Sequence, residues 1–218
     1  MTPTHDIFLT GGTGYIGRQL IPRLVTRGHR IRALVRAGSE SKLPFGAEPI
    51  IGDALDVASF AERVAPADTF VQLVGVAHPS PAKAALFRTV DLASAVASAD
   101  AAVHAGVAHF VYVSVARPAP VMKAYQQARA EAEEALRSRG LNATILRPWY
   151  VLGPGHRWPI VLLPFYAMAA WIPSMRESAR RLRPVTLENV LAALVQAVES
   201  PARGIRVVET PELRAARS

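Results

Sequence analysis

The sequence predicts an α/β protein built around a doubly wound parallel sheet. Three observations lead to this prediction: half of the 218 residues are hydrophobic, short apolar runs alternate with longer segments of helical period, and a glycine-rich stretch follows the first apolar run. This length and apolar content suffice for one well-packed domain. Because the chain has no cysteine, disulfide frameworks, thiolate nucleophiles and iron–sulfur clusters are excluded, and a reducing compartment is expected.

The apolar runs and the helical segments define the expected elements in order. Strands are predicted over residues 6–10, 31–35, 48–51, 69–74, 109–114, 143–146 and 205–208. Helices are predicted over residues 15–27, 57–64, 83–105, 124–139 and 187–199. Thr186 caps the last helix, while Gly28, Gly106 and Gly140 mark the ends of three others. Right-handed crossovers then place all the strands in one sheet.

Residues 1–218 are expected to form a single nucleotide-binding domain with three parts: a core over 1–148, an apolar cap over 149–184, and a closing helix and strand over 185–218. The cap breaks the alternation of strands and helices, and its large apolar side chains are Trp158, Ile160, Leu162, Leu163, Phe165, Tyr166, Met168, Trp171 and Ile172. A basic turn follows, which is either a solvated face or a site of loose association with an anionic membrane surface: Arg176, Arg180, Arg181 and Arg183.

The formal net charge is +8, and the basic residues are mainly arginine. No helix-turn-helix, zinc finger or aromatic-basic pattern accompanies this charge, so no nucleic-acid partner is predicted. The first nine residues lack the pattern of a signal peptide, and the longest apolar stretch, residues 158–173, is too short to span a bilayer. A cytoplasmic protein is therefore expected.

A glycine motif with the spacing G-x-x-G-x-x-G follows the first strand directly and opens the first helix. Gly11 allows a tight turn, Gly14 lets the backbone approach a pyrophosphate without a Cβ in the way, and Gly17 permits close packing of helix on strand. The backbone amides at the helix start then bind the anion, as in Rossmann-type domains. The alternative is a plain glycine-rich turn, which the strand before and the helix after disfavour. The other loop residues expected beside the cofactor are Thr13, Tyr15 and Ile16.

The end of the second strand favours NADP(H) over NAD(H). An acidic residue there would accept the ribose 2′-hydroxyl of NAD, but residues 35–39 read V-R-A-G-S, and residues 7–39 contain no Asp or Glu. A 2′-phosphate would find charge-assisted donors in Arg36, with Arg18 and Ser39. The remaining arginines of this stretch are read as solvating helix and strand ends: Arg23, Arg27, Arg30 and Arg32.

In these motifs the chain resembles the atypical short-chain dehydrogenase/reductases, the NmrA-like NAD(P)H-binding proteins. Further matching motifs lie at residues 52–56, 75, 111–114, 125–129 and 146–148, so the resemblance covers nearly the whole chain. It implies cofactor contacts beyond the glycine motif. Those contacts are Asp53 and Ala54 beside the adenine, Val74, Gly75 and Val76 along the ribose, and residues from Pro148 to Val151 near the nicotinamide. Taken singly, residues 52–53 could instead be a plain turn and Pro148 the stop after a strand.

The resemblance also implies a catalytic set of Ser114, Tyr125 and Arg129. The tyrosine would give or take the substrate proton, the serine would donate to the substrate oxygen, and a nearby cation would bind the ribose and lower the tyrosine pKa from about 10. The i, i+4 spacing puts residues 125 and 129 on one helix face. Active family members have lysine where this chain has Arg129, and arginine has a bulkier, forked geometry.

Two structural alternatives accompany this set. Tyr125 and Arg129 could lie on a solvated helix beside Lys123, Glu131 and Glu133. His78, after Gly75, could be a proton donor or only a loop residue before a proline. No pair of histidines has metal-ligand spacing, so no metal site is predicted.

The sequence thus predicts an NADP(H)-dependent oxidoreductase acting on a small, hydrophobic carbonyl or quinone-like substrate, as a monomer or homodimer. The apolar cap lies where the family shapes its substrate pocket, although core or dimer-interface packing would also explain it. The alternative function is a redox sensor or assembly factor that holds NADP(H) without turnover.

Overall fold

The fold of the chain is given by a computed structural model that describes residues 3–154, 177 and 181–216. Seven parallel strands form its central sheet in the order β3-β2-β1-β4-β5-β6-β9. The order reverses between β1 and β4, which confirms the doubly wound α/β class. The strands are β1 (Asp6–Thr10), β2 (Arg30–Val35), β3 (Ala47–Ile51), β4 (Thr69–Gln72), β5 (His109–Val113), β6 (Ala143–Arg147) and β9 (Ile205–Glu209).

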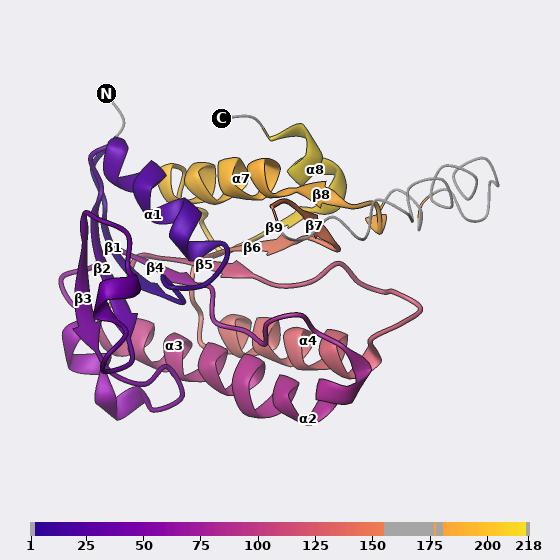
Figure 1. Cartoon of the computed structure of the whole chain (residues 1–218), viewed down its shortest axis with the longest axis horizontal. Helices are drawn as coiled ribbons and strands as arrows, with labels where there is room; N and C mark the ends of the chain where they lie inside the picture. The colour runs from indigo at the N-terminus through magenta and orange to yellow at the C-terminus, as the bar shows by residue number, and fades with distance from the viewer. Residues whose placement is uncertain (1–2, 155–176, 178–180, 217–218) are drawn as a thin grey trace.

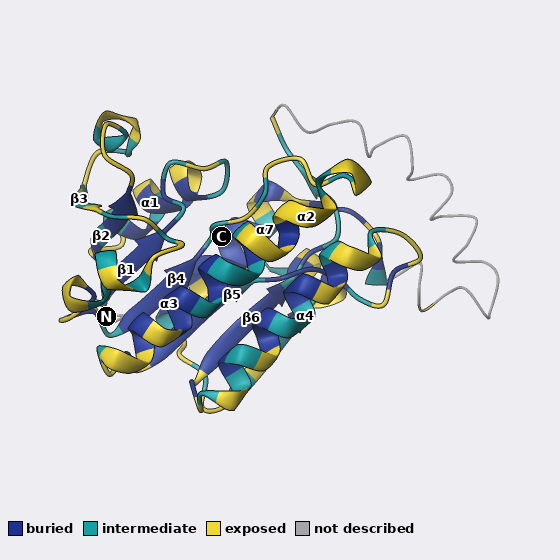
Figure 2. Ribbon diagram, turned by 90° about the horizontal axis from the view of Figure 1, so that it is seen from below, coloured by how far each residue is buried: buried dark blue, intermediate teal, exposed yellow. Residues whose placement is uncertain are grey.

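Helices cover both faces of this sheet (Figure 1). One face carries α1 (Gly17–Thr26), α7 (Leu187–Glu199) and α8 (Thr210–Ala215), and the other carries α2 (Ala84–Leu86), α3 (Ala93–His104) and α4 (Lys123–Ser138). Figure 2 shows buried strands between helices whose outer faces are exposed. Side chains alternate between the two layers, so each face has its own apolar cluster.

An aromatic row runs across the face under α3 and α4. Phe8, Phe70 and Phe110 are register partners on β1, β4 and β5, and each is fully buried. The ring centroids are 5.3 Å apart for the first pair and 5.1 Å apart for the second. Helix α3 presents mainly alanine to this layer, which lets it pack close to the rings. The row therefore holds the three central strands in register.

The helix predicted over residues 57–64 is absent. Two 3₁₀ turns, η2 (Val57–Ser59) and η3 (Ala61–Arg63), stand in its place. Phe60 between them has φ −145° and is only 1% exposed, because its ring stacks on Phe8 at 6.0 Å. Burial of one aromatic side chain thus outweighs the helical period of a segment too short to form a stable helix.

The long helix predicted over residues 83–105 is not uniform. It begins with the 3₁₀ turn η4 (Pro81–Lys83) and α2, passes through a π-helical stretch, η5 (Phe87–Leu92), and ends as α3. The wider π-helical turn lies where Phe87 and Asp91 are buried. Such stretches are frequent at functional sites.

Four short elements lie outside the predicted set. They are the 3₁₀ turn η1 (Glu40–Lys42), the paired strands β7 (Val151–Leu152) and β8 (Val185–Thr186), and α8. The β7–β8 pair joins the two ends of the cap segment. Helix α8 starts with a capping box made by Glu209 and Glu212, a signal that is visible in the sequence. The predicted cap at Thr186 is confirmed, with Asn189 as its partner.

Most of the predicted cap lies outside the described residues, including all of its large apolar side chains from Trp158 to Ile172 and two members of the basic turn, Arg176 and Arg180. Arg181 is described, and its guanidinium donates to the carbonyl of Pro118 at 3.1 Å. Within the described part of the chain, the helices are all too short or too polar to cross a membrane.

A buried histidine at the start of β5 makes the fold sensitive to acid. His109 is 1% exposed, and its Nε2 lies 3.0 Å from Thr144 Oγ1. Burial lowers the pKa of His109 from 6.5 to about 4, with His5 lowering it further and Asp68 opposing. The native chain therefore holds this imidazole neutral at physiological pH.

We expect unfolding experiments to reveal this histidine. The unfolded chain binds a proton near pH 6.5 and the folded chain only near 4, so the free energy of unfolding falls as pH drops through this window, by at most about 3 kcal/mol. Urea denaturation from pH 7.5 to 4.5 should show a shallower decline in His109→Gln than in the unchanged chain. The control is His104→Gln, at an exposed histidine. Equal declines in all three proteins would contradict the assignment.

Candidate active site

The glycine loop between β1 and α1 makes close backbone contacts, both within itself and with the segment after β4. Gly11 has φ +80°, and a Cβ there would lie 2.8 Å from the carbonyl carbon of Leu73, at the end of β4. A Cβ on Gly17 would collide with the carbonyl oxygen of Gly11, so the start of α1 packs directly on the loop. These contacts confirm that the turn and the close packing each need glycine at that position.

The start of α1 is suited to an anion. In this fully described segment no side chain caps the helix, and its first turn contains no acidic residue. Gly14 is exposed on the cavity side, where it has no side chain to block an approach. Backbone amides and the positive end of the helix dipole are thus presented to solvent, and this arrangement fits a pyrophosphate.

A cavity of about 400 Å³ extends from this loop along the carboxyl ends of β4, β5 and β6. It brings together predicted residues that lie far apart in the sequence. Those lining it are Gly11, Gly14, Tyr15, Ile16, Gly17, Gly75, Val76, His78, Ser114, Tyr125, Arg129, Pro148 and residues 149–151. The predicted residues outside its lining are Thr13, Arg18, Arg36, Ser39, Asp53, Ala54 and Val74.

The segment after β6 closes over the glycine loop. A Cβ on Gly153 would collide with the hydroxyl of Tyr15, so the two segments touch through a glycine. Opposite them, His78 adopts a left-handed backbone with φ 50°, and its carbonyl accepts from Lys83 Nζ at 3.1 Å. The cavity is therefore framed by loops that other parts of the chain hold in place.

The arginines of residues 7–39 differ in what they contact. Arg23 on α1 pairs with Glu188, and Arg27 at the end of α1 pairs with Glu199; both glutamates lie on α7. Arg30 pairs with Asp6, and Arg32 donates to carbonyls of residues 63–65. Arg18 and Arg36, the two arginines predicted to bind the 2′-phosphate, are both exposed. Within the described chain, neither makes an ion pair or a side-chain hydrogen bond.

Asp53 lies at the carboxyl end of β3, as predicted, and is exposed. Its carboxylate accepts from the amide of Leu55 at 3.0 Å, and its own amide contacts Ser59 Oγ at 2.9 Å. The local turn at residues 52–53 is therefore real, and it holds Asp53 and Ala54 at the sheet edge where a parallel-sheet ligand binds.

Arg129 is buried, not solvated. Its Nη2 donates to Asp91 Oδ1 at 2.5 Å, and its Nη1 donates to the Tyr112 hydroxyl at 3.1 Å and the Val113 carbonyl at 2.8 Å. The guanidinium carbon lies 5.2 Å from the centroid of the Tyr125 ring, within the range of a cation–π interaction. Tyr125 and Arg129 thus share one helix face, as predicted.

The pKa of Tyr125 differs from the expectation. Burial raises the pKa of Tyr125 above 10, and the charge of Arg129 opposes this only in part. Asp91, fully buried beside Arg129, adds a negative charge that also raises the tyrosine pKa. Tyr125 is therefore a protonated hydroxyl at neutral pH, and the predicted lowering toward working pH was wrong.

Ser114 faces a partner that was not predicted. Its hydroxyl donates to Glu133 Oε1 at 2.7 Å, whereas it was expected to donate to a substrate oxygen. Glu133 is fully buried, and it also accepts from Arg117 at 2.6 Å and Arg147 at 2.5 Å. Despite its burial, these donors hold the pKa of Glu133 below its ordinary value. The serine proton is thus committed to an ionised carboxylate.

Sequence spacing could have revealed this partner. Tyr125, Arg129 and Glu133 are at i, i+4 and i+8, so they line one face of α4, and Arg129 and Glu133 are both buried. The alternative of a solvated helix was wrong for Arg129 and Glu133, which are buried, and right for Lys123, which is exposed. Asp91 could not be found in this way, since nothing in the sequence distinguishes it from a surface residue.

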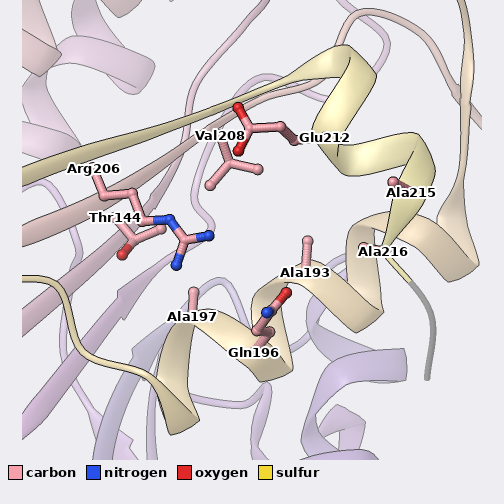
Figure 3. Close-up of a pocket in the computed structure, with 9 residues that line it drawn as sticks. All are labelled: Thr144, Ala193, Gln196, Ala197, Arg206, Val208, Glu212, Ala215 and Ala216. Atoms are coloured by element: carbon pink, nitrogen blue, oxygen red, sulfur yellow. The ribbon is translucent and has the colours of Figure 1, made fainter.

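A second pocket, of about 260 Å³, lies away from this cavity (Figure 3). It opens between α7, α8 and the strands β6 and β9, with Arg206 and Glu212 on its sides and alanines along the helices. Glu212 is engaged in the cap of α8. No group of three or more potential metal ligands occurs among the described residues, here or in the main cavity.

The family of the chain follows from comparison with known proteins. The model for NAD(P)H-binding proteins matches residues 11–157, which is well over half of the sequence. The chain belongs to this family, the NmrA-like NAD(P)H-binding proteins among the atypical short-chain dehydrogenase/reductases.

Two curated relatives and one solved structure illustrate its neighbourhood. A ceramide reductase of Caulobacter vibrioides (strain NA1000 / CB15N) is 29% identical over 95% of this chain and 65% of its own length. The 4-hydroxy-2-methyl-3-oxo-4-farnesyl-3,4-dihydroquinoline-1-oxide ketoreductase of Stigmatella aurantiaca is 27% identical over 67% of this chain and 50% of its own. The chain therefore spans about two thirds and one half of these relatives. The enzyme WbmH of Bordetella bronchiseptica, solved with NAD+, shares the fold, with a TM-score of 0.70, 18% identity, and coverage of 95% of this chain and 76% of that one.

Replacing Glu133 by glutamine should destabilise the chain by roughly 3 kcal/mol, because it removes the charge of a fully buried carboxylate that pairs with the half-buried Arg117 and Arg147. The matched control is Glu134→Gln on the exposed side of the same helix, which should change the free energy of unfolding by less than about 0.5 kcal/mol. Urea denaturation at neutral pH measures both. Similar small effects in the two variants would show that the buried carboxylate contributes little.

Proposed function

We propose that this chain is an NADP(H)-dependent oxidoreductase that reduces a small, hydrophobic carbonyl or quinone-like compound. The observation that carries the proposal is the position of Tyr125: a protonated tyrosine lines the same cavity as the glycine loop. Membership of the NAD(P)H-binding family supports the cofactor class. The names of the two relatives, a reductase and a ketoreductase, agree with the type of reaction.

The choice of NADP(H) is supported by the arginines around the end of β2. Four of the six arginines in residues 7–39 are engaged by acidic side chains or carbonyls, whereas Arg18 and Arg36 are exposed without such partners in the described chain. A ribose 2′-phosphate bears charge that these two guanidinium groups could neutralise. We therefore assign the 2′-phosphate contact to Arg36, with Arg18 and Ser39 beside it.

When bound in this cavity, a reduced nicotinamide dinucleotide would supply the hydride that the carbonyl carbon of the substrate requires. Tyr125 donates its hydroxyl proton to the carbonyl oxygen, so the product is an alcohol and the tyrosine is left as tyrosinate. Arg129 lies against its ring and stabilises that negative charge. Because its pKa is raised, Tyr125 is protonated at neutral pH and holds the proton that reduction requires.

The described lining of the cavity suits an apolar substrate. Leu73, Val76, Val113, Val115 and Trp149 contribute to it. The relatives' names contain a ceramide and a farnesyl group, which are hydrophobic. We propose that the hydrophobic substrate is the main partner of the chain and that no nucleic acid or membrane surface is required. We also propose that the chain works as a monomer or homodimer and, being free of cysteine, acts in the cytoplasm.

Two contacts favour a second candidate, a protein that holds NADP(H) without turnover. The Ser114 hydroxyl is committed to Glu133, and the Arg129 charge is balanced by Asp91. A site whose polar groups already satisfy one another could serve a redox sensor or an assembly factor. Turnover decides between the two candidates.

The cofactor assignment predicts a selective loss in Arg36→Gln. Removing one charge-assisted hydrogen bond should weaken NADPH binding by about 10- to 100-fold and leave NADH binding within about threefold. Arg27→Gln removes the same charge from an arginine paired with Glu199 and is the matched control. Calorimetric titration measures the affinities of the unchanged chain and of both variants for NADPH and NADH. Equal affinity of the unchanged chain for NADPH and NADH would contradict the assignment.

The proton-donor assignment predicts that Tyr125→Phe binds NADPH within about threefold of the unchanged chain but loses at least about 100-fold in turnover. NADPH oxidation is followed over a panel of hydrophobic ketones, aldehydes and quinones. Tight NADPH binding by the unchanged chain with no turnover on any compound would favour the second candidate. Full activity in Tyr125→Phe would exclude this tyrosine as the acid.

A further inference from the structure

A buried carboxylate joins the loop after β4 to helix α4. Asp91 lies in the π-helical stretch η5 and has no exposed surface. Its Oδ2 accepts from the backbone amide of Val76 at 3.1 Å, and its Oδ1 accepts from Arg129 Nη2 at 2.5 Å. One side chain thus binds the segment that lines the cavity and the cation that lies against Tyr125.

The guanidinium of Arg129 is confined to one position by these contacts. A Cβ on Gly75 would collide with Arg129 Nη2 and lie 3.0 Å from Asp91 Oδ1, so the ion pair fills the space that this glycine leaves. The Tyr112 hydroxyl and the Val113 carbonyl hold the other side of the guanidinium. Without Asp91, Arg129 would keep those two contacts but would have no counter-charge.

We propose that Asp91 is a positioning residue for proton donation: it anchors Arg129 over the Tyr125 ring and keeps the tyrosine protonated until the substrate receives its proton. The inference rests on the proposed function, in which Tyr125 is the acid. In addition to that role of Tyr125, Asp91 sets the charge balance of the site, and the same carboxylate holds the loop at Val76.

The charge balance around Tyr125 can be described from the contacts. Arg129 on the same helix stabilises tyrosinate, whereas Asp91 on η5 opposes it. Tyr112 on β5 is a neutral hydroxyl, since burial raises its pKa to about 12. Ser114 and His78 line the same cavity. Neutralising Asp91 alone would leave Arg129 as the dominant charge.

The test follows the ionisation of Tyr125 without any dinucleotide. The full chain is prepared with 3,5-difluorotyrosine, which ionises near neutral pH, and the fluorine resonance of residue 125 is assigned through Tyr125→Phe. We expect this residue to ionise at a lower pH in Asp91→Asn than in the unchanged chain. The matched control is Glu131→Gln, which removes a carboxylate from an exposed ion pair on α4 and should leave the titration unchanged.

A double variant keeps the test decisive if Asp91→Asn does not fold. Asp91→Asn with Arg129→Gln removes both charges, so Tyr125 should ionise at a higher pH than in the unchanged chain. The same midpoint in the unchanged chain and in whichever of these variants folds would overturn the proposal. Because the titration needs no cofactor, its failure is distinct from a failure to bind NADPH or to turn over.

The contact between Asp91 and the loop at Val76 is tested separately, by the affinity for NADPH. Asp91→Ala loses both contacts of the carboxylate and should bind NADPH at least about tenfold more weakly, whereas Asp91→Asn can still accept from Val76 and should stay within about threefold. Equal losses in both variants would show that charge alone matters there and would overturn the role assigned to the loop contact.

Discussion

The segments that follow strands β1 and β4 lie side by side, and their backbones are in contact just beyond the carboxyl ends of these strands. At that point Gly11 approaches Leu73 so closely that a Cβ would lie 2.8 Å from its carbonyl carbon. Gln72 strengthens the contact, because its amide oxygen binds both the Thr10 hydroxyl and the Val74 amide. The helix start that can bind an anion lies on one side of this contact, and the loop held by Asp91 lies on the other. The contact thus joins two of the segments that line the cavity.

Local signals predicted much of the fold. Glycines, caps and apolar runs act within a few residues, so the strands, α1, α4 and α7 were located to within a few positions. The failures arise where a tertiary contact decides the outcome. The ring of Phe60 enters the core and breaks a helix, and a π-helical turn buries Asp91. Many residues of the cavity were predicted from motifs. The spacing on α4 could also have revealed Glu133 as a buried partner of Ser114, whereas Asp91, the partner of Arg129, comes from another element and had no local signal.

The arginines of this chain show how burial separates structural charge from available charge. A buried or paired guanidinium is satisfied by a carboxylate or by carbonyl oxygens, as Arg129 and Arg147 are. A high count of arginine therefore says little about anionic partners until these pairs are subtracted. Around β2 the subtraction leaves Arg18 and Arg36, and only such residues can gain a new partner without losing an old one.

Arg147 at the end of β6 binds two carboxylates at once, Glu133 on α4 and Glu209 at the end of β9. Glu209 also caps α8, while Glu133 holds Ser114. The last helix of the described chain is thus connected to Ser114 through the side chains of Glu209, Arg147 and Glu133. A substitution at Glu209 would leave Arg147 paired with Glu133 alone, so the end of β9 and the surroundings of Ser114 are coupled through one guanidinium group.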